Sequence, residues 1–216
     1  GGEGTIIAMD PKNSDIMYAS SFYGRLMKSN LRMPKTAWGQ KPHPDSIRTK
    51  DIFPKKADDE EVHRGEWLAF TMVSPHDNKT IYHGFQYLFE SKDGGESWKR
   101  ISDDLTYNDK SRMGKTPYAI NHQAITAIDE SPLKKGLLYA GTDDGRIWMR
   151  AADGGTFVNI MKGIPQHAHA SRLVASSHQE NRVYLTLSNR REDDDKPYIY
   201  VSDDKGMTWR RIAANL

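Results

Sequence analysis

Short runs of apolar residues, separated by polar turns, form the dominant pattern along this chain. A run, a turn and a second run that ends near a tyrosine occur four times. In each copy the tyrosine follows a fixed turn position by seven residues, in the following pairs: Pro11 and Tyr18, Pro75 and Tyr82, Pro132 and Tyr139, Ser177 and Tyr184. An interval that is kept in four copies indicates an internal structural repeat.

Each copy continues with a third apolar run, found at 25–28, 87–90, 146–149 and 198–201. In three copies an acidic, glycine-bearing turn and a fourth short run follow. Runs of about four to six residues that are rich in Ile, Val, Tyr and Phe, and bounded by Gly, Pro, Asn and Asp, predict β-strands. No segment keeps the apolar period of about 3.6 residues that predicts a helix.

Four strands per copy predict an all-β fold, a β-propeller of four-stranded antiparallel blades with four blades present. A β-sandwich also has short strands, but it would not repeat one unit four times. We take 1–216 as a single partial propeller, with blades at approximately the following ranges: 5–66, which carries a long insertion, 67–122, 123–170 and 171–216. Because a propeller closes when its last blade packs on its first, we expect the remaining blades of a larger ring in the same or another chain.

The acidic turns carry a recognisable motif. Residues 91–98 and 202–209 both have the pattern Ser-x-Asp-x-Gly-x-(Ser/Thr)-Trp, and 151–157 is a shortened copy that ends in phenylalanine. This pattern resembles the Asp-box, or bacterial neuraminidase repeat, of β-propeller proteins. Together with 102–109 and 131–145, it is similar to large secreted bacterial proteins described as Asp-box glycosyl hydrolases or as sortilin-like. The first repeat lacks the motif after Lys28.

The residue types of these turns favour a structural role. An aspartate carboxylate can accept hydrogen bonds from the amides that follow it, glycine tolerates a positive φ, and a tryptophan can pack between neighbouring blades. We therefore expect the turns to brace the fold without reacting, through these residues: Ser91, Asp93, Gly95, Trp98, Asp153, Gly155, Phe157, Ser202, Asp204, Gly206 and Trp209.

Composition narrows the choice of partners. The chain has 31 Lys and Arg against 29 Asp and Glu, a net charge of +2, which gives no case for binding nucleic acid. It has no cysteine, which excludes disulfides, thiolate metal sites and a cysteine nucleophile. Its apolar runs are far shorter than the roughly 18 residues that span a bilayer, so we expect no direct membrane insertion.

The resemblance implies a secreted, periplasmic or cell-surface protein, whose signal peptide is not in the chain shown.

The long loops at the mouth of such a propeller suggest a binding function. We expect a ligand-, glycan- or protein-binding module within a larger protein or assembly. Exposed aromatic rings can stack on sugars or seat a peptide, and arginines can pair with carboxylates. The candidate binding residues are Trp38, Tyr107, Arg112, Tyr118 and Arg190.

A glycoside hydrolase that uses two carboxylates at the mouth is the alternative. Such enzymes hold their carboxyl groups about 5–9.5 Å apart, depending on the mechanism. The candidate catalytic residues are Asp103, Asp104, Asp143 and Asp144, although Asp-Asp-Gly at 143–145 also fits an ordinary hairpin turn. We expect no cofactor and no metal site, because the histidines at 167 and 169 fit a solvated loop.

Overall fold

The computed structural model describes residues 6–34, 37, 39–41, 48–58, 61–113 and 123–213. Within these residues the chain forms sixteen β-strands, two short 3₁₀ turns and no α-helix. The strands make four antiparallel sheets of four strands, and each sheet is a meander whose neighbours follow one another along the chain. No helix among the described residues is long and apolar enough to cross a membrane.

The elements have the following bounds. The first sheet contains β1 (Ile7–Asp10), β2 (Asn13–Ser21), β3 (Arg25–Asn30) and β4 (Thr49–Asp51), with η1 (Phe22–Gly24) between β2 and β3. The second contains β5 (Thr71–Val73), β6 (Ile81–Gly84), β7 (Leu88–Ser91) and β8 (Lys99–Arg100). The third contains β9 (Ile125–Glu130), β10 (Leu138–Thr142), β11 (Ile147–Arg150) and β12 (Val158–Asn159). The fourth contains β13 (His169–Ala175), β14 (Val183–Asn189), β15 (Asp194–Ser202) and β16 (Arg210–Arg211), with η3 (Arg190–Glu192) between β14 and β15.

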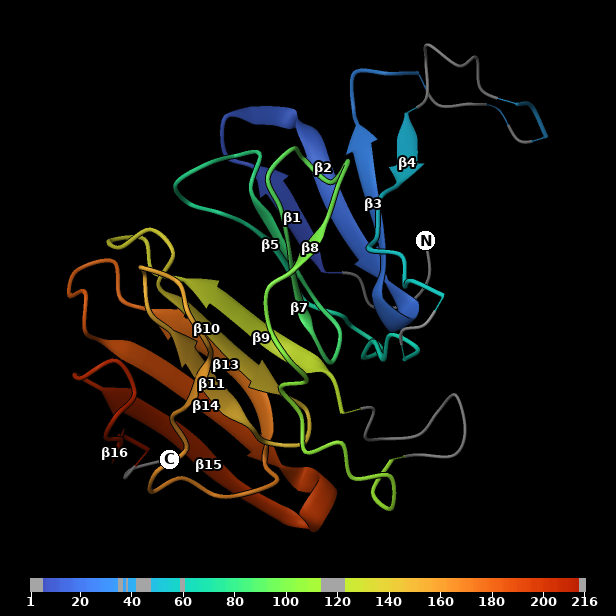
Figure 1. Ribbon diagram of the computed structural model, residues 1–216. Helices are drawn as coiled ribbons and strands as arrows, with labels where there is room; N and C mark the ends of the chain where they lie inside the picture. Colours follow the sequence, from blue (N-terminus) through green and yellow to red (C-terminus); the bar gives the residue numbers. More distant parts are fainter. Residues whose placement is uncertain are drawn as a thin grey trace.

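The four sheets are arranged around a common axis. In Figure 1 they run from the first sheet, in blue at the upper right, to the fourth, in orange and red at the bottom. The first strand of each sheet is the innermost one, and β1 contacts β5, β5 contacts β9, and β9 contacts β13. A cavity of about 510 Å³ lies between these four strands. The prediction of an all-β partial propeller is therefore confirmed.

The apolar core lies between consecutive sheets rather than in one central layer. Each of three clusters is built around one of the repeated tyrosines, Tyr18, Tyr82 or Tyr139, and contains buried residues from two adjacent sheets. Burial raises the pKa of Tyr18 to about 12 and raises that of the other two further. The repeated tyrosine thus packs one sheet against the next.

The two full acidic turns share one hydrogen-bond pattern. Asp93 accepts the N–H and the hydroxyl of Ser97 at 2.9 and 2.5 Å, and Asp204 accepts the same two groups of Thr208 at 2.8 and 2.6 Å. These bonds, led by that of the hydroxyl, hold the pKa of both carboxyl groups below its usual range. The first residue of each octet, Ser91 or Ser202, bonds to the aspartate and accepts the N–H of the motif glycine: Gly95 at 2.8 Å and Gly206 at 2.7 Å.

The shortened turn of the third sheet differs because it has Ala151 where the other two have serine. Asp153 is exposed there. The carbonyl of Gly155 accepts a hydrogen bond from Arg150 Nε at 3.1 Å, and Phe157 packs against the core between the second and third sheets.

Candidate functional site at the mouth of the propeller

One end of the sheets gathers the turns between second and third strands and the loops that join consecutive sheets. We call this end the mouth. A four-stranded antiparallel meander reverses direction at every turn, so the turns between third and fourth strands, including both full acidic turns, lie at the opposite end. Contacts across the mouth join distant segments, because Arg191, which follows β14, faces Asp143 at 3.4 Å and Glu66 at 3.6 Å.

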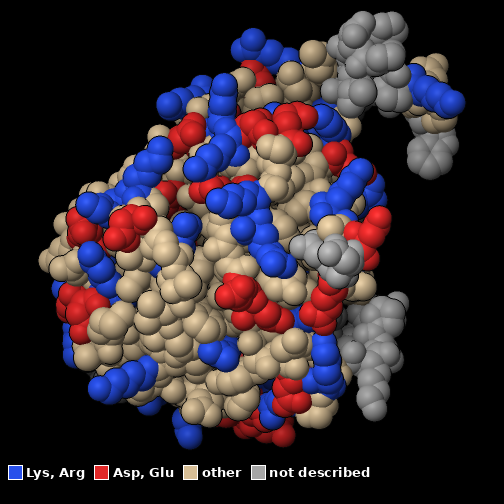
Figure 2. Space-filling view, in the orientation of Figure 1, with Lys and Arg blue, Asp and Glu red and all other residues tan. Residues whose placement is uncertain are grey.

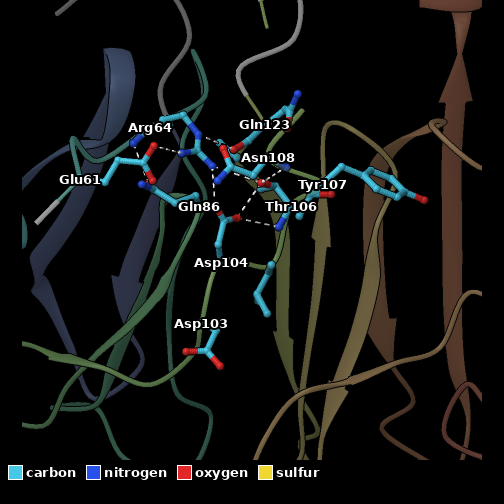
Figure 3. A network of polar contacts seen from close by, with 12 residues as sticks. Glu61, Arg64, Gln86, Asp103, Asp104, Thr106, Tyr107, Asn108 and Gln123 are labelled. Atoms are coloured by element: carbon cyan, nitrogen blue, oxygen red, sulfur yellow. Dashed lines mark hydrogen bonds and ion pairs between the residues drawn. The ribbon is translucent and has the colours of Figure 1, made fainter. Parts of the chain in front are cut away.

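Arg64 is the centre of a polar network at the mouth, shown in Figure 3. Its guanidinium lies 2.6 Å from the carboxylate of Asp104 and 3.2 Å from that of Glu61. It also donates a hydrogen bond to the hydroxyl of Thr106 at 3.2 Å. Lys110 pairs with Glu61 at 2.8 Å, and this bond is the main reason that the pKa of Glu61 is lowered. The network therefore joins the loop before β5 to the loop after β8.

Two buried glutamines complete this connection. Gln86 accepts the backbone N–H of Arg64 at 2.7 Å and donates to the carbonyl of Val62 at 2.9 Å. Gln123 accepts the N–H of Asp109 at 2.6 Å and donates to the carbonyl of the same residue at 2.5 Å. Because a buried amide that loses its partners is costly, these bonds fix the described parts of the mouth loops in one arrangement.

The four aspartates predicted as catalytic candidates have different surroundings. Asp103 is exposed, and in Figure 3 it lies apart from the Arg64 network, whereas Asp104 belongs to it. Asp143 is buried and accepts the N–H of Ala124 at 2.8 Å.

Asp144 is buried and accepts the N–H of Tyr107 at 2.7 Å and the hydroxyl of Thr142. Burial raises the pKa of Asp144, and the nearby Asp104 adds to this effect. Asp104, Asp143 and Asp144 thus all accept hydrogen bonds from the chain itself.

The predicted binding residues are only partly brought together. The ring of Tyr107 stacks on that of His167 with centroids 4.7 Å apart, and the guanidinium of Arg146 lies 4.8 Å from it. Arg112 forms an ion pair with Glu192, which joins the loop after β8 to the fourth sheet.

The remaining candidates lie elsewhere. Arg190 is exposed and lies 3.6 Å from Asp195. Trp38 and Tyr118 lie outside the described residues. Within the described part of the chain, no group of three or more His, Cys, Asp or Glu side chains could hold a metal ion.

A cavity that the sequence analysis missed opens between the first and second sheets at the mouth. Its volume is about 650 Å³, and its lining is rich in aromatic rings: Phe22, Tyr23, Phe53, His63 and Phe85. Phe22 and Tyr23 pack on Trp67, with ring centroids 4.4 and 5.5 Å apart. Tyr23 has a φ of 58° and remains partly exposed, so the turn between β2 and β3 presents its ring to solvent.

The rim of this aromatic cavity is positively charged. Lys55, Lys56 and Arg25 line it together with one acidic residue, Asp51. Arg25 is paired with Asp51 at 2.8 Å, and the ammonium of Lys56 donates to the carbonyl of Ala57 at 2.8 Å. Over the face seen in Figure 2, by contrast, charges of both signs are interspersed. The local excess of cations makes the cavity attractive to a ligand with an acidic group.

The fold defines the class: a segment of a β-propeller with a polar and aromatic mouth. No protein-family model and no curated protein matches the chain. Among solved structures, the GH74 xyloglucanase from Xanthomonas campestris is 16% identical with a TM-score of 0.61, covering 95% of this chain and 30% of that chain. An ancestral GH74 enzyme is 17% identical with a TM-score of 0.63, covering 100% and 25%. An auxiliary nutrient binding protein from Bacteroides thetaiotaomicron is 10% identical with a TM-score of 0.55, covering 94% and 39%.

At these identities the likeness shows the β-propeller fold. The chain spans 25–39% of the length of these three larger propellers. Blades beyond the four present here thus complete the propellers that this chain resembles.

Proposed function

We propose that this chain is a binding segment of a larger, extracytoplasmic β-propeller, and that it holds a glycan in the aromatic cavity of the mouth. The observation that carries the proposal is the pairing of exposed ring surface with a cationic rim in one cavity. A sugar ring presents an apolar C–H face that packs on an aromatic ring, and its hydroxyl groups need polar partners at the edge. Tyr23 supplies such a ring, and Lys55 supplies a cation for an acidic substituent.

Two further observations support a binding role. The structures that share the fold include GH74 enzymes, one of them a xyloglucanase, and an auxiliary nutrient binding protein. At the mouth, the carboxylates of Asp104, Asp143 and Asp144 already accept hydrogen bonds from other groups of this chain. In this proposal the two full acidic turns are Asp-boxes that brace the opposite end, and the protein is secreted, periplasmic or at the cell surface.

Titration calorimetry with two kinds of oligosaccharide tests the proposal. Xyloglucan oligosaccharides serve as the neutral probe and oligogalacturonates as the acidic probe, and we expect the acidic probe to bind more tightly. Tyr23→Asn removes the ring at a position whose positive φ asparagine accepts. An aromatic contact contributes about 0.5–1.5 kcal/mol, so affinity should fall about 2- to 13-fold.

The matched control is Tyr184→Asn. Tyr184 is exposed to nearly the same extent but lies on β14, away from the cavity. Its variant should bind both probes as the native chain does. Lys55→Gln should weaken binding of the acidic probe alone. Equal affinity of the native chain and Tyr23→Asn, or no binding of either probe, would refute the proposal.

A glycoside hydrolase is the second candidate, and the raised pKa of Asp144 is the observation that favours it. A general acid in glycoside hydrolysis needs a raised pKa, and the partner carboxylate would be Asp104. The test of this second candidate compares the turnover of a polysaccharide panel by the native chain, by Asp104→Asn and by Asp144→Asn. Activity that is lost in both variants supports a hydrolase, and activity that survives both removes these residues from the reaction.

A further inference from the structure

All four sheets end in an equivalent isoleucine. The backbone N–H of this residue donates to a carbonyl in the third strand of its own sheet, at 2.9, 2.9, 2.9 and 2.8 Å in chain order. The pairs are Ile52 with Leu26, Ile101 with Leu88, Ile160 with Ile147 and Ile212 with Ile199. Because the register is the same in each sheet, the surroundings of the four isoleucines can be compared directly.

Two of these isoleucines are held by the acidic turn of the next sheet. The carbonyl of Ile52 accepts the indole N–H of Trp98 at 2.5 Å, and the carbonyl of Ile160 accepts that of Trp209 at 2.7 Å. A Cβ at Gly95 would lie 2.4 Å from Cδ1 of Ile52, so only glycine leaves room for the isoleucine. Gly206 stands in the same relation to Ile160, also at 2.4 Å. We call this contact the blade lock: the glycine and the tryptophan of a full acidic turn hold the isoleucine that ends the preceding sheet.

The interface between the second and third sheets shows what happens without a full turn. The third sheet has the shortened turn, and a Cβ at Gly155 would meet nothing within 4 Å. The indole N–H that crosses this interface comes instead from Trp148 and reaches the carbonyl of Leu105 at 2.6 Å. Ile101 is followed by Ser102, whose hydroxyl folds back to accept the N–H of Leu88 at 2.8 Å.

The isoleucine that ends the fourth sheet, Ile212, resembles the two that a blade lock holds, but no further blade follows it in the described chain. Ile212 is 42% exposed, whereas Ile52 and Ile160 are 5% and 2% exposed. Like those two, it is followed by an apolar residue, Ala213. The repeated tyrosine behaves in the same way, because Tyr184 is 37% exposed while its three equivalents are at most 3% exposed.

We propose that the face formed by Val174, Tyr184 and Ile212 docks one further four-stranded blade, and that this blade carries a full acidic turn. Its motif glycine would lie over the side chain of Ile212, and its tryptophan would donate the indole N–H to the carbonyl of Ile212. The first sheet of this chain is a poor occupant, because the segment after Lys28 lacks the octet. A ring closed by the first sheet, from this chain or from a second copy, would leave the lock at Ile212 empty.

An extended chain tests this proposal independently of any ligand. A copy of residues 161–216 is joined after Ile212, so that the connection reproduces the one that follows Ile160. The added blade brings a full turn at the copied 202–209. We expect it to raise the melting temperature by about 3 °C or more, since it packs on the apolar face at Ile212.

Matched extensions identify the lock. Gly206→Val in the added copy alone should remove the gain in melting temperature. Trp209→Phe in the added copy keeps an apolar ring and should halve this gain. Ile212→Asp should abolish the gain, measured as the difference between the extended and the unextended chain that both carry this substitution. Joining a copy of 6–51 instead should give no gain. An equal gain from that first-sheet copy, no gain from the full-turn copy, or a dimer of the native chain that Ile212→Asp dissociates would each overturn the proposal.

Discussion

Replacing Arg64 with methionine should destabilise the mouth far more than the same change at an exposed arginine. Methionine keeps most of the alkyl stem but removes the guanidinium that joins Asp104, Glu61 and Thr106. The side chains of Arg64 and Asp104 are only 13% and 20% exposed. Asp104 would keep its bonds from the N–H and hydroxyl of Thr106, at 2.9 and 2.6 Å, and would lose its cation.

The expected loss follows from this burial. Removing one partner of a buried ion pair costs about 3–5 kcal/mol, and because both groups are partly exposed, Arg64→Met should lower the free energy of unfolding by about 2–3 kcal/mol. Arg112→Met is the matched control. Arg112 pairs with Glu192, their side chains are 38% and 45% exposed, and such surface pairs contribute about 0–1 kcal/mol.

Urea unfolding of four proteins measures the effect: the native chain, Arg64→Met, Asp104→Asn and the double variant. A contact of this kind should give a coupling free energy of about 1–3 kcal/mol between the two sites. Added salt should leave the Arg64 effect nearly unchanged and weaken that of Arg112. Equal losses for Arg64→Met and Arg112→Met, or additive effects of Arg64→Met and Asp104→Asn, would refute the assignment of Arg64 as the central connection of the mouth.

Three further predictions concern the turns and the core. Asp93→Asn should lower the melting temperature at pH 7 and by a smaller amount at pH 2, because the lowered pKa of Asp93 gives stability that begins to be lost as the pH falls below about 4, whereas the exposed Asp153→Asn should change neither value. Gly206→Ala should lower the melting temperature more than Gly155→Ala, since both residues have a φ near 90° but only Gly206 faces a close neighbour, and equal effects would contradict this. Burial lowers the pKa of His83 to about 4. As the pH falls from 6.5 to 4, the unfolded chain binds a proton at this residue before the folded chain does, so the free energy of unfolding should fall by up to about 3 kcal/mol. His83→Gln should flatten that part of the pH–stability curve.

The fold could be predicted because its signals are local and repeated. The interval from the turn to the tyrosine reports the pairing of the first two strands of each sheet, for example Ala8 with Tyr18 and Met72 with Tyr82. A strand needs only neighbouring residues of the right type, so four copies of one pattern specify four sheets. The same pattern cannot show whether another blade covers a sheet face. Tyr184 and Tyr139, for example, occupy the same position of the repeat in the sequence, although only Tyr139 is buried.

The aromatic cavity could not be predicted because its rings come from separate turns and loops. Phe22 and Tyr23 follow β2, Phe53 follows β4 and Phe85 follows β6. Each stands beside a strand, where an aromatic residue is usually part of the packing between blades. Only the folded chain shows which rings face the mouth.

The aspartate pair 143–144 illustrates the same limit. Two adjacent carboxylates at a turn are consistent with catalysis or with a hairpin, and the choice depends on what approaches them. The groups that approach include the N–H of Ala124 and the N–H of Tyr107, from a loop that precedes them by many residues, and the guanidinium of Arg191, which follows them. The predictions for Trp38 and Tyr118 stay predictions, because both residues lie outside the described chain.

The second full acidic turn and the aromatic cavity lie in different parts of the molecule, because Trp209 of that turn bonds to Ile160 of the third sheet, whereas the cavity lies between the first and second sheets. The first full turn is placed differently, because Gly95 and Trp98 contact Ile52, whose neighbours Asp51 and Phe53 line the cavity. Ile52 belongs to the apolar cluster that contains Tyr18 and Ile81, and Phe53 and Trp98 pack against this cluster. Substitutions at Gly206 or Trp209 should therefore lower stability and leave ligand affinity intact, whereas Tyr23→Asn should lower affinity and leave stability nearly unchanged.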